Sequence, residues 1–263
     1  MKKRIITGLL GGALFLLITF LGGYWFTALV FLIASLAYYE LIRMNHRKFF
    51  DLPGIVGMVL LWLILFPDLI WNHDFIRGDV IFLFIFLFLF LTVASKNRIE
   101  YKQAAYFFLS SMYLGIAFHY LLETRLNYGF GVTMTIIAGI WATDTGALFF
   151  GKKFGKRKLW PAISPNKTIE GSLGGGLLGI IIVVLISYFA NITSLLPLST
   201  AILIGLVIAI GGQLGDLMES AVKRSLHVKD SGEILPGHGG MYDRFDSMIV
   251  VFPILYLVQL LSL

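Results

Sequence analysis

The chain has 263 residues, of which 58% are hydrophobic and only 14% are charged, and it contains 23 phenylalanines and no cysteine. This composition excludes an ordinary soluble globular protein and indicates an integral membrane protein, while the lack of cysteine excludes disulfides, thiolate metal sites and cysteine nucleophiles. The formal net charge of +6 does not indicate nucleic-acid binding, because the cations stand in short loops between apolar runs, where they set topology and attract anionic lipid headgroups.

Apolar runs close to the 20 or so residues that cross a bilayer recur along the whole chain. Nine of them cover residues 5–22, 24–42, 54–71, 80–95, 104–122, 130–150, 171–190, 198–215 and 247–263. The first follows a basic start, Met1-Lys2-Lys3-Arg4, but no small-residue cleavage site separates it from the second, so we expect an uncleaved first helix. The predicted fold is an all-α polytopic membrane protein with about nine transmembrane helices.

The chain is predicted to form a single membrane domain over residues 1–263. We can assign no chemistry to residues 1–103 beyond a scaffold, and we expect residues 130–246 to hold the catalytic helices and cytoplasmic loops.

The loop charges test the count of spans independently. Nineteen of the 21 lysines and arginines fall at the N-terminus and in alternate loops, and only Arg77 and Arg125 fall in the others. By the positive-inside rule, this asymmetry predicts a cytoplasmic N-terminus, two long cytoplasmic loops and a C-terminus outside. We therefore expect a multi-pass protein of the cell's inner (cytoplasmic) membrane.

The stretch Gln213–Asp246 gathers six carboxylates, four cations and a glycine-rich turn between two apolar runs. Carboxylates suit Mg²⁺, while cations and glycine amides suit phosphates, so we expect a metal and phosphate site at a membrane surface. Asp216, Glu219, Ser220 and Lys223 share one face if the preceding helix continues. The alternative is a solvated helix end with an ordinary Glu219–Lys223 pair.

Asp144 lies inside the sixth apolar run, on the same face as Trp141 and Thr145. An acidic side chain at membrane depth is costly unless it is paired or binds a cation. We favour a metal or substrate role over a purely structural pair with a lysine.

The loop after that run carries a basic cluster at residues 151–158, which suits topology and anionic lipid. It continues with Ser164-Pro165-Asn166-Lys167-Thr168, where hydroxyls, an ammonium and free amides precede a helix start and suit an anionic ligand. A helix-capping turn with a solvated lysine is the alternative. The loop lacks the glycine-rich pattern of a Walker loop.

The turn Pro236-Gly237-His238-Gly239-Gly240 lets backbone amides approach a ligand closely. His238 could donate to a phosphate, act as a general acid or be a plain turn residue. Asp243 and Asp246 directly precede the last apolar run, and carboxylates so close together favour a bound cation. A simple charge effect at a helix N-terminus is the alternative.

The last part of this stretch reads Ser220-x-Val222-Lys223-Arg224-x₄-Lys229-Asp230-x-Gly232-x₂-Leu235-Pro236-x-His238-Gly239-Gly240-Met241-x-Asp243-Arg244-Phe245-Asp246. It resembles, at every fixed position, the signature of the phosphatidate cytidylyltransferases (CDP-diacylglycerol synthases). Ser164-Pro165-x-Lys167-Thr168-x-Glu170-Gly171 and the Asp144 helix are similar to less specific motifs of that family. The resemblance covers about residues 141–246; the N-terminal half is similar only in hydropathy.

The resemblance implies a Mg²⁺-dependent reaction of CTP with phosphatidic acid that gives CDP-diacylglycerol and pyrophosphate, with room for a second cation. It also implies a homodimer, which the sequence itself does not show. We expect the metal to be held by Asp144, Asp216, Asp243 and Asp246, with Lys223 and Arg224 completing the catalytic set. The residues expected to bind the nucleotide and lipid phosphates are Ser164, Lys167, Thr168, Ser220, Lys229, His238, Gly239, Gly240 and Arg244.

Two other functions share part of this pattern. A CTP-dependent membrane lipid kinase would use the same metal and phosphate groups but transfer the γ-phosphoryl group to a lipid alcohol. An ion-coupled transporter would use Asp144 and Asp216 as an ion path. A polyprenyl-phosphate sugar transferase does not match the signature.

Overall fold

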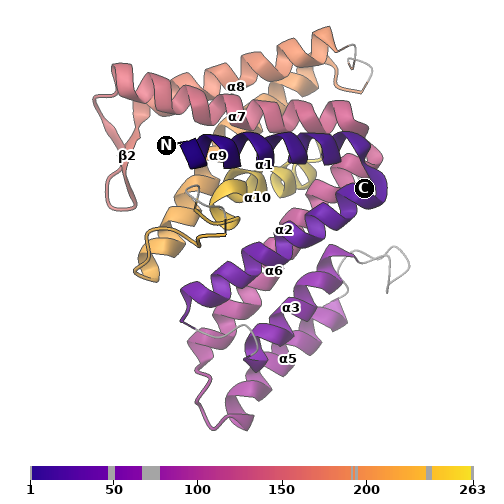
Figure 1. Cartoon of the computed structure of the whole chain (residues 1–263), viewed down its shortest axis with the longest axis vertical. Helices are drawn as coiled ribbons and strands as arrows, with labels where there is room; N and C mark the ends of the chain where they lie inside the picture. Colours follow the sequence, from indigo (N-terminus) through magenta and orange to yellow (C-terminus); the bar gives the residue numbers. More distant parts are fainter. Residues whose placement is uncertain are drawn as a thin grey trace.

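The computed structural model describes residues 2–46, 51–66, 78–190, 192, 195–234 and 239–261. Within these ranges the chain forms nine helices and one short β-hairpin (Figure 1). The helices are α1 (Lys2–Leu21), α2 (Gly23–Met44), α3 (Leu52–Leu65), α5 (Gly78–Ala94), α6 (Tyr101–Asn127), α7 (Gly129–Phe154), α8 (Ile169–Phe189), α9 (Leu198–Ser225) and α10 (Tyr242–Leu257), and the strands are β1 (Lys158–Trp160) and β2 (Ser164–Thr168).

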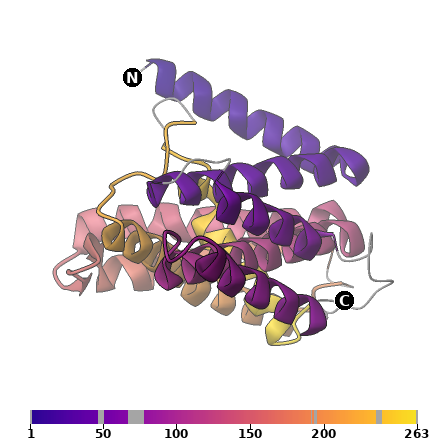
Figure 2. The same ribbon diagram turned by 90° about the horizontal axis from the view of Figure 1, so that it is seen from below.

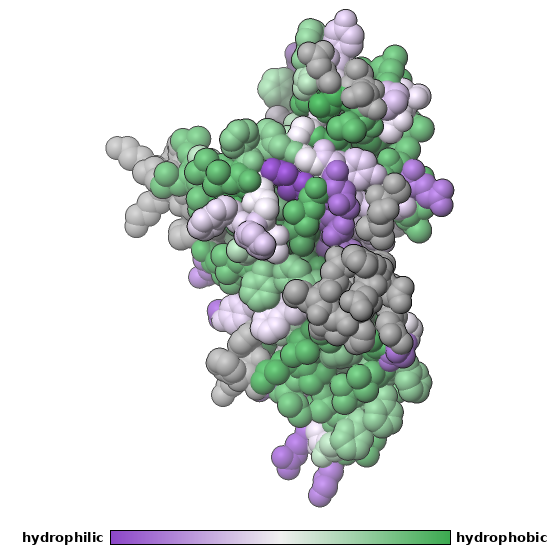
Figure 3. All heavy atoms as spheres, turned by 90° about the vertical axis from the view of Figure 1, so that its right-hand side faces the viewer, coloured by the Kyte–Doolittle hydropathy of each residue, from purple (hydrophilic) through white to green (hydrophobic). Residues whose placement is uncertain are grey.

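Five of the described helices are long and apolar enough to cross a membrane, namely α2, α6, α7, α8 and α9. Their outer faces are apolar as well: on α8, residues at intervals of four, Leu173, Leu177, Ile181 and Leu185, are 43% to 71% exposed. Apolar side chains also cover much of the face drawn in Figure 3. Because so much exposed apolar surface is unfavourable in water and neutral in lipid, the chain is a multi-pass membrane protein. The count of nine spans stays a prediction.

The predicted runs each coincide with a helix, but several ends differ. α9 continues to Ser225, ten residues beyond the predicted end at 215, and α10 begins at Tyr242 instead of 247 and ends at Leu257. α3 ends at Leu65 instead of 71. The end of α9 and the start of α10 were missed because a search for apolar runs stops at the first charged residues. A helix continues through such residues when they find partners.

The expectation of an all-α chain is wrong at one place, the antiparallel hairpin of β1 and β2. Lys158 pairs with Thr168 and Trp160 with Ser164. The Glu170 carboxylate, at the start of α8, accepts hydrogen bonds from the backbone N–H groups of Lys156 (3.0 Å) and Arg157 (3.2 Å). These bonds fold the loop back on α8. β1 has only three residues and β2 is Ser-Pro-Asn-Lys-Thr, so neither strand shows a two-residue apolar alternation.

The helices form two groups that meet at α6 and α10. α6 contacts α2, α3, α5, α7 and α10, while α10 also contacts α9, α7 and α2. Figure 1 shows α7 and α8 side by side in one group, and Figure 2 shows α1 along one edge of the molecule, next to α2. α10 therefore lies where the two groups meet, and its first turn carries the end of the signature.

α7 and α8 approach closely because glycines face the contact. A Cβ added at Gly175 of α8 would meet the Thr143 carbonyl oxygen and lie 2.6 Å from the Ala147 nitrogen, both backbone atoms of α7. Small residues that allow such backbone approach are the usual means of helix packing in lipid.

We expect Gly175→Ala to destabilise the protein by about 1–3 kcal/mol, because the added methyl group has no space and the backbone of α7 must shift. Thermal unfolding in detergent would measure the loss. Gly11→Ala is the matched control, since a Cβ there meets nothing within 4 Å. Equal unfolding temperatures for the two variants would contradict this packing.

Candidate active site

A cavity of about 480 Å³ opens between α7, β2, α8 and α9. Its lining brings together Asp144 from α7, Lys167 from β2 and Asp216 from α9. Lys167 Nζ forms an ion pair with Asp216 Oδ2, and Asp144 lies close enough to both for their charges to interact. Three residues separated by up to 72 positions in the sequence thus share one hollow.

The hairpin and two polar side chains hold the walls of this cavity in place. Thr168, at the end of β2, accepts a hydrogen bond from the Gly171 N–H (3.2 Å) and so caps α8. Gln213 Nε2 donates to the Ser172 carbonyl oxygen (3.0 Å), which ties α9 to α8. The capping alternative is therefore confirmed for Thr168, while Lys167 is not a solvated lysine.

Asp216 also connects the cavity to α10. Ser247 Oγ donates to Asp216 Oδ1 (3.0 Å), and the Ser247 N–H donates to Asp246 Oδ1 (2.8 Å). The carboxyl groups of Asp216 and Asp246 lie close enough for their charges to interact, and Ser247 donates to both. This approach needs Gly215, where a Cβ would lie 2.8 Å from Ser247 Cα.

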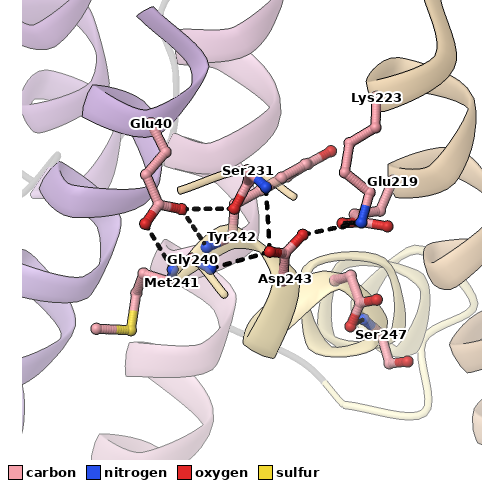
Figure 4. A network of polar contacts seen from close by, with 10 residues as sticks. Glu40, Glu219, Lys223, Ser231, Gly240, Met241, Tyr242, Asp243 and Ser247 are labelled. Atoms are coloured by element: carbon pink, nitrogen blue, oxygen red, sulfur yellow. Dashed lines mark hydrogen bonds and ion pairs between the residues drawn. The ribbon is translucent and has the colours of Figure 1, made fainter. Parts of the chain in front are cut away.

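A second network surrounds Lys223, which lies about two helical turns beyond Asp216 on α9 (Figure 4). Lys223 Nζ forms ion pairs with Glu219 and with Asp243 Oδ1, the latter at 2.9 Å. Asp243 Oδ2 accepts from the backbone N–H groups of Ser231 (3.1 Å) and Gly240 (2.9 Å). Both oxygens of Asp243 thus accept hydrogen bonds, and this carboxylate joins α9, α10 and the loop between them, residues 226–241, which we call the signature loop.

The predicted site residues therefore divide into three sets. Asp144, Lys167, Thr168 and Asp216 line the cavity, with Asp246 against Asp216. Lys223, Asp243 and Gly240 belong to the second network. The remaining predicted residues that the structure describes do not line the cavity: Ser164, Ser220 and Gly239 are partly buried, and Arg224, Lys229 and Arg244 are exposed. His238 lies outside the described residues, and its role stays a prediction.

The sequence-based reasoning missed several residues of these networks. Gln213 and Ser247 carry no pattern that distinguishes them from other polar residues near helix ends. Glu40 had a usable signal, because it is an acidic residue within a predicted span, where an ionisable group is costly unless it is partnered. Glu40 accepts hydrogen bonds from Ser231, Met241 and Tyr242.

Across the part of the chain that the structure describes, no group of three or more acidic or histidine side chains lies close enough to hold one metal ion by itself. The carboxylates are instead distributed over the cavity and the second network, where Asp216, Glu219 and Asp243 each pair with a lysine. Such a site, with hard oxygen donors and ammonium groups, can take up a cation together with phosphates.

The fold and site define a multi-pass helical membrane protein with a charged cavity built from carboxylates and lysines of separate helices. The model of the cytidylyltransferase family matches residues 2–261, nearly the whole chain. The chain therefore belongs to the cytidylyltransferase family.

Similar proteins named phosphatidate cytidylyltransferase occur in several bacteria. The one from Bacillus subtilis (strain 168) is 43% identical over 264 residues, which is 97% of this chain and 96% of that protein. Those of Staphylococcus aureus (strain COL) and Staphylococcus saprophyticus are 41% and 40% identical, and the alignments cover all of both chains for the first and 97% of each for the second.

We expect Lys223→Met to destabilise the protein by roughly 3 kcal/mol, the lower end for breaking a buried ion pair, because it leaves Glu219 and Asp243 facing each other. Unfolding in detergent at neutral pH measures the loss. Arg224→Met, which removes the same charge from the exposed neighbouring position, is the control for stability. A loss no larger than that of the control would show that the second network does not contribute to folding.

Proposed function

We propose that this chain is a phosphatidate cytidylyltransferase, which transfers CMP from CTP to phosphatidate and forms CDP-diacylglycerol and pyrophosphate. The observation that carries the proposal is the identity of 40% to 43% to proteins of that name over nearly the full length of both chains. The cavity supports it, because a site with lysines and carboxylates in a membrane protein suits a reaction between a nucleotide and a lipid phosphate.

The reaction needs positioning and charge neutralisation more than covalent chemistry from the protein. An oxygen of the phosphatidate phosphate attacks the α-phosphorus of CTP, and the bond from that phosphorus to the oxygen bridging to the β-phosphorus breaks. Pyrophosphate leaves with the bonding electrons. No general base is required, because the attacking phosphate is already ionised near neutral pH.

The carboxylates of the cavity fit Mg²⁺. This ion is usually held by one or two carboxylates together with substrate phosphates and waters, so a cage of three protein ligands is not needed. Asp216 and Asp246, whose carboxyl groups lie close enough for their charges to interact, would hold it, with Asp144 beside them. When bound, Mg²⁺ supplies positive charge that neutralises the nucleotide phosphates and the leaving pyrophosphate.

The lysines have roles that follow from their present partners. Lys167 pairs with Asp216, so it can release this carboxylate to a cation and bind a substrate phosphate in its place. Lys223 is held by Glu219 and Asp243 and is fixed in position for a phosphate near the end of α9. We assign Asp243 chiefly to organising the signature loop, because both of its oxygens accept hydrogen bonds.

The membrane arrangement belongs to the same proposal. We infer nine spans, a cytoplasmic N-terminus and an outer C-terminus in the inner membrane, supported by nineteen cations on one side against two on the other. CTP is a cytoplasmic nucleotide, so this orientation places the cavity where the substrate is. We also propose that the chain forms a homodimer and that the site binds a second cation.

The reaction is tested with purified protein in mixed micelles of detergent and phosphatidate, supplied with CTP labelled at either the α- or the γ-phosphate. We expect label to enter the lipid from the α-position only, and pyrophosphate to appear only when both phosphatidate and Mg²⁺ are present. Label from the γ-position would show a lipid kinase instead. If the protein does not turn over CTP in detergent but takes up ions when reconstituted in vesicles, the transporter is favoured.

We expect Asp246→Asn to lower kcat at least 100-fold and to weaken Mg²⁺ binding in the presence of CTP, because an amide is a poor substitute for a carboxylate ligand. Calorimetric titration with Mg²⁺ measures binding independently of turnover. Asp79→Asn, an acid in the first turn of α5, is the control of equal charge change. Unaltered Mg²⁺ affinity in the Asp246 variant would remove Asp246 from the metal site.

A further inference from the structure

Glu40 is a buried carboxylate near the end of α2, far in sequence from the signature loop that it contacts. Glu40 is only 1% exposed. It accepts three hydrogen bonds, from Ser231 Oγ (2.8 Å), the Met241 N–H (2.7 Å) and the Tyr242 N–H (2.9 Å) (Figure 4). Hydrogen bonds to a charged acceptor are stronger than neutral ones, so this cluster is a firm connection.

Two of the three donors are the backbone N–H group of Tyr242, the first residue of α10, and that of Met241, the residue just before it. A helix leaves such groups without partners inside the helix, and its N-terminus favours negative charge. The residue before α10, Met241, has no side-chain oxygen with which to cap it, and no side-chain cap is formed there. Glu40 therefore caps α10 from another helix.

Two glycines of the signature are explained by the same carboxylate. A Cβ at Gly232 would lie 2.8 Å from Glu40 Oε1, and a Cβ at Gly240 would meet both Glu40 Oε2 and Ser231 Oγ. The loop can close on Glu40 only because these positions have no side chain.

The described part of the loop also borders a cavity on this side. The cavity, of about 490 Å³, lies between the end of α2 and residues 228–234, and Glu40, Ser231 and Gly232 are on its wall. The hydrogen bonds from Ser231 and Met241 to Glu40 connect this part of the loop to α2.

We infer that Glu40 is a positioning residue for cytidylyl transfer: it holds the signature loop and the first turn of α10 so that Asp243 and Asp246 face α9. This inference rests on the proposed function. The connection runs from Glu40 to the start of α10, then through Asp243 to Lys223 and through Ser247, next to Asp246, to Asp216. The N-terminal half thus contributes to the site without touching substrate.

The test compares Glu40→Gln with Glu233→Gln, which removes an exposed carboxylate from the same loop. Gln has the shape of Glu but no charge, and half of its terminal group is a donor that faces other donors. We expect kcat at saturating CTP and phosphatidate to fall at least 10-fold in the Glu40 variant, with KM for CTP changed less than 3-fold. The control keeps wild-type kcat.

To distinguish a positioning role from a purely structural one, the folded fraction and the unfolding temperature of each variant are measured in the assay detergent. A kcat that falls only in proportion to the folded fraction, or one that equals the wild-type value, overturns the inference.

Ser231→Ala removes one of the three hydrogen bonds and serves if the Glu40 variant does not fold. We expect it to lower kcat per folded molecule about 3-fold, and wild-type kcat there also counts against the inference. In the double variant the two effects should combine to less than their product, because both act through one cluster. Absence of lipid product from the wild-type chain would instead overturn the proposed function, and the inference with it.

Discussion

Carboxylates near the ends of membrane helices are the constraint on which the rest of this structure depends. Each would be costly in a medium of low dielectric unless a cation or several donors compensated it. Asp216 is compensated by Lys167, Asp243 by Lys223 and two backbone N–H groups, and Glu40 by three donors. Because every partner comes from a different element, meeting this constraint fixes where the helices lie.

The same pairings prepare the site for its chemistry. A lysine that neutralises a carboxylate before the substrates arrive can move to a phosphate when a cation takes its place, so the charge balance of the cavity changes little during the exchange. The carboxylate of Asp243 differs, because its three hydrogen bonds leave it little freedom. The site thus combines the Lys167–Asp216 ion pair in the cavity with a more extensively hydrogen-bonded network around Lys223.

The glycines of the chain follow from this close approach of elements. Gly175 lets α8 approach the backbone of α7, Gly215 lets α9 approach α10, and Gly240 lets the signature loop close on Glu40. In lipid, where apolar association between helices gains little, close backbone packing and hydrogen bonds between helices act together with the packed apolar core.

The sequence by itself determined the membrane character and the approximate place of each described helix, and it supplied the residues proposed for the site. Runs of apolar residues and the signature 220–246 are local patterns, readable without knowing any contact. Hydropathy could not give the continuation of α9 through Asp216 to Ser225, the hairpin or the start of α10 at Tyr242. Each of these depends on partners distant in the chain, such as Glu170 for the hairpin.

Only the tertiary structure decided how the site residues divide. It pairs Lys167 with Asp216 and shows that Asp243 lies outside the cavity lining. It also shows that Glu40 accepts a hydrogen bond from α10, 202 positions away in the sequence. A sequence pattern reports the type and spacing of residues, but the cost of a buried charge is relieved by whichever donor lies nearest in space. That is why an apparently plain apolar helix supplied a residue that organises the site.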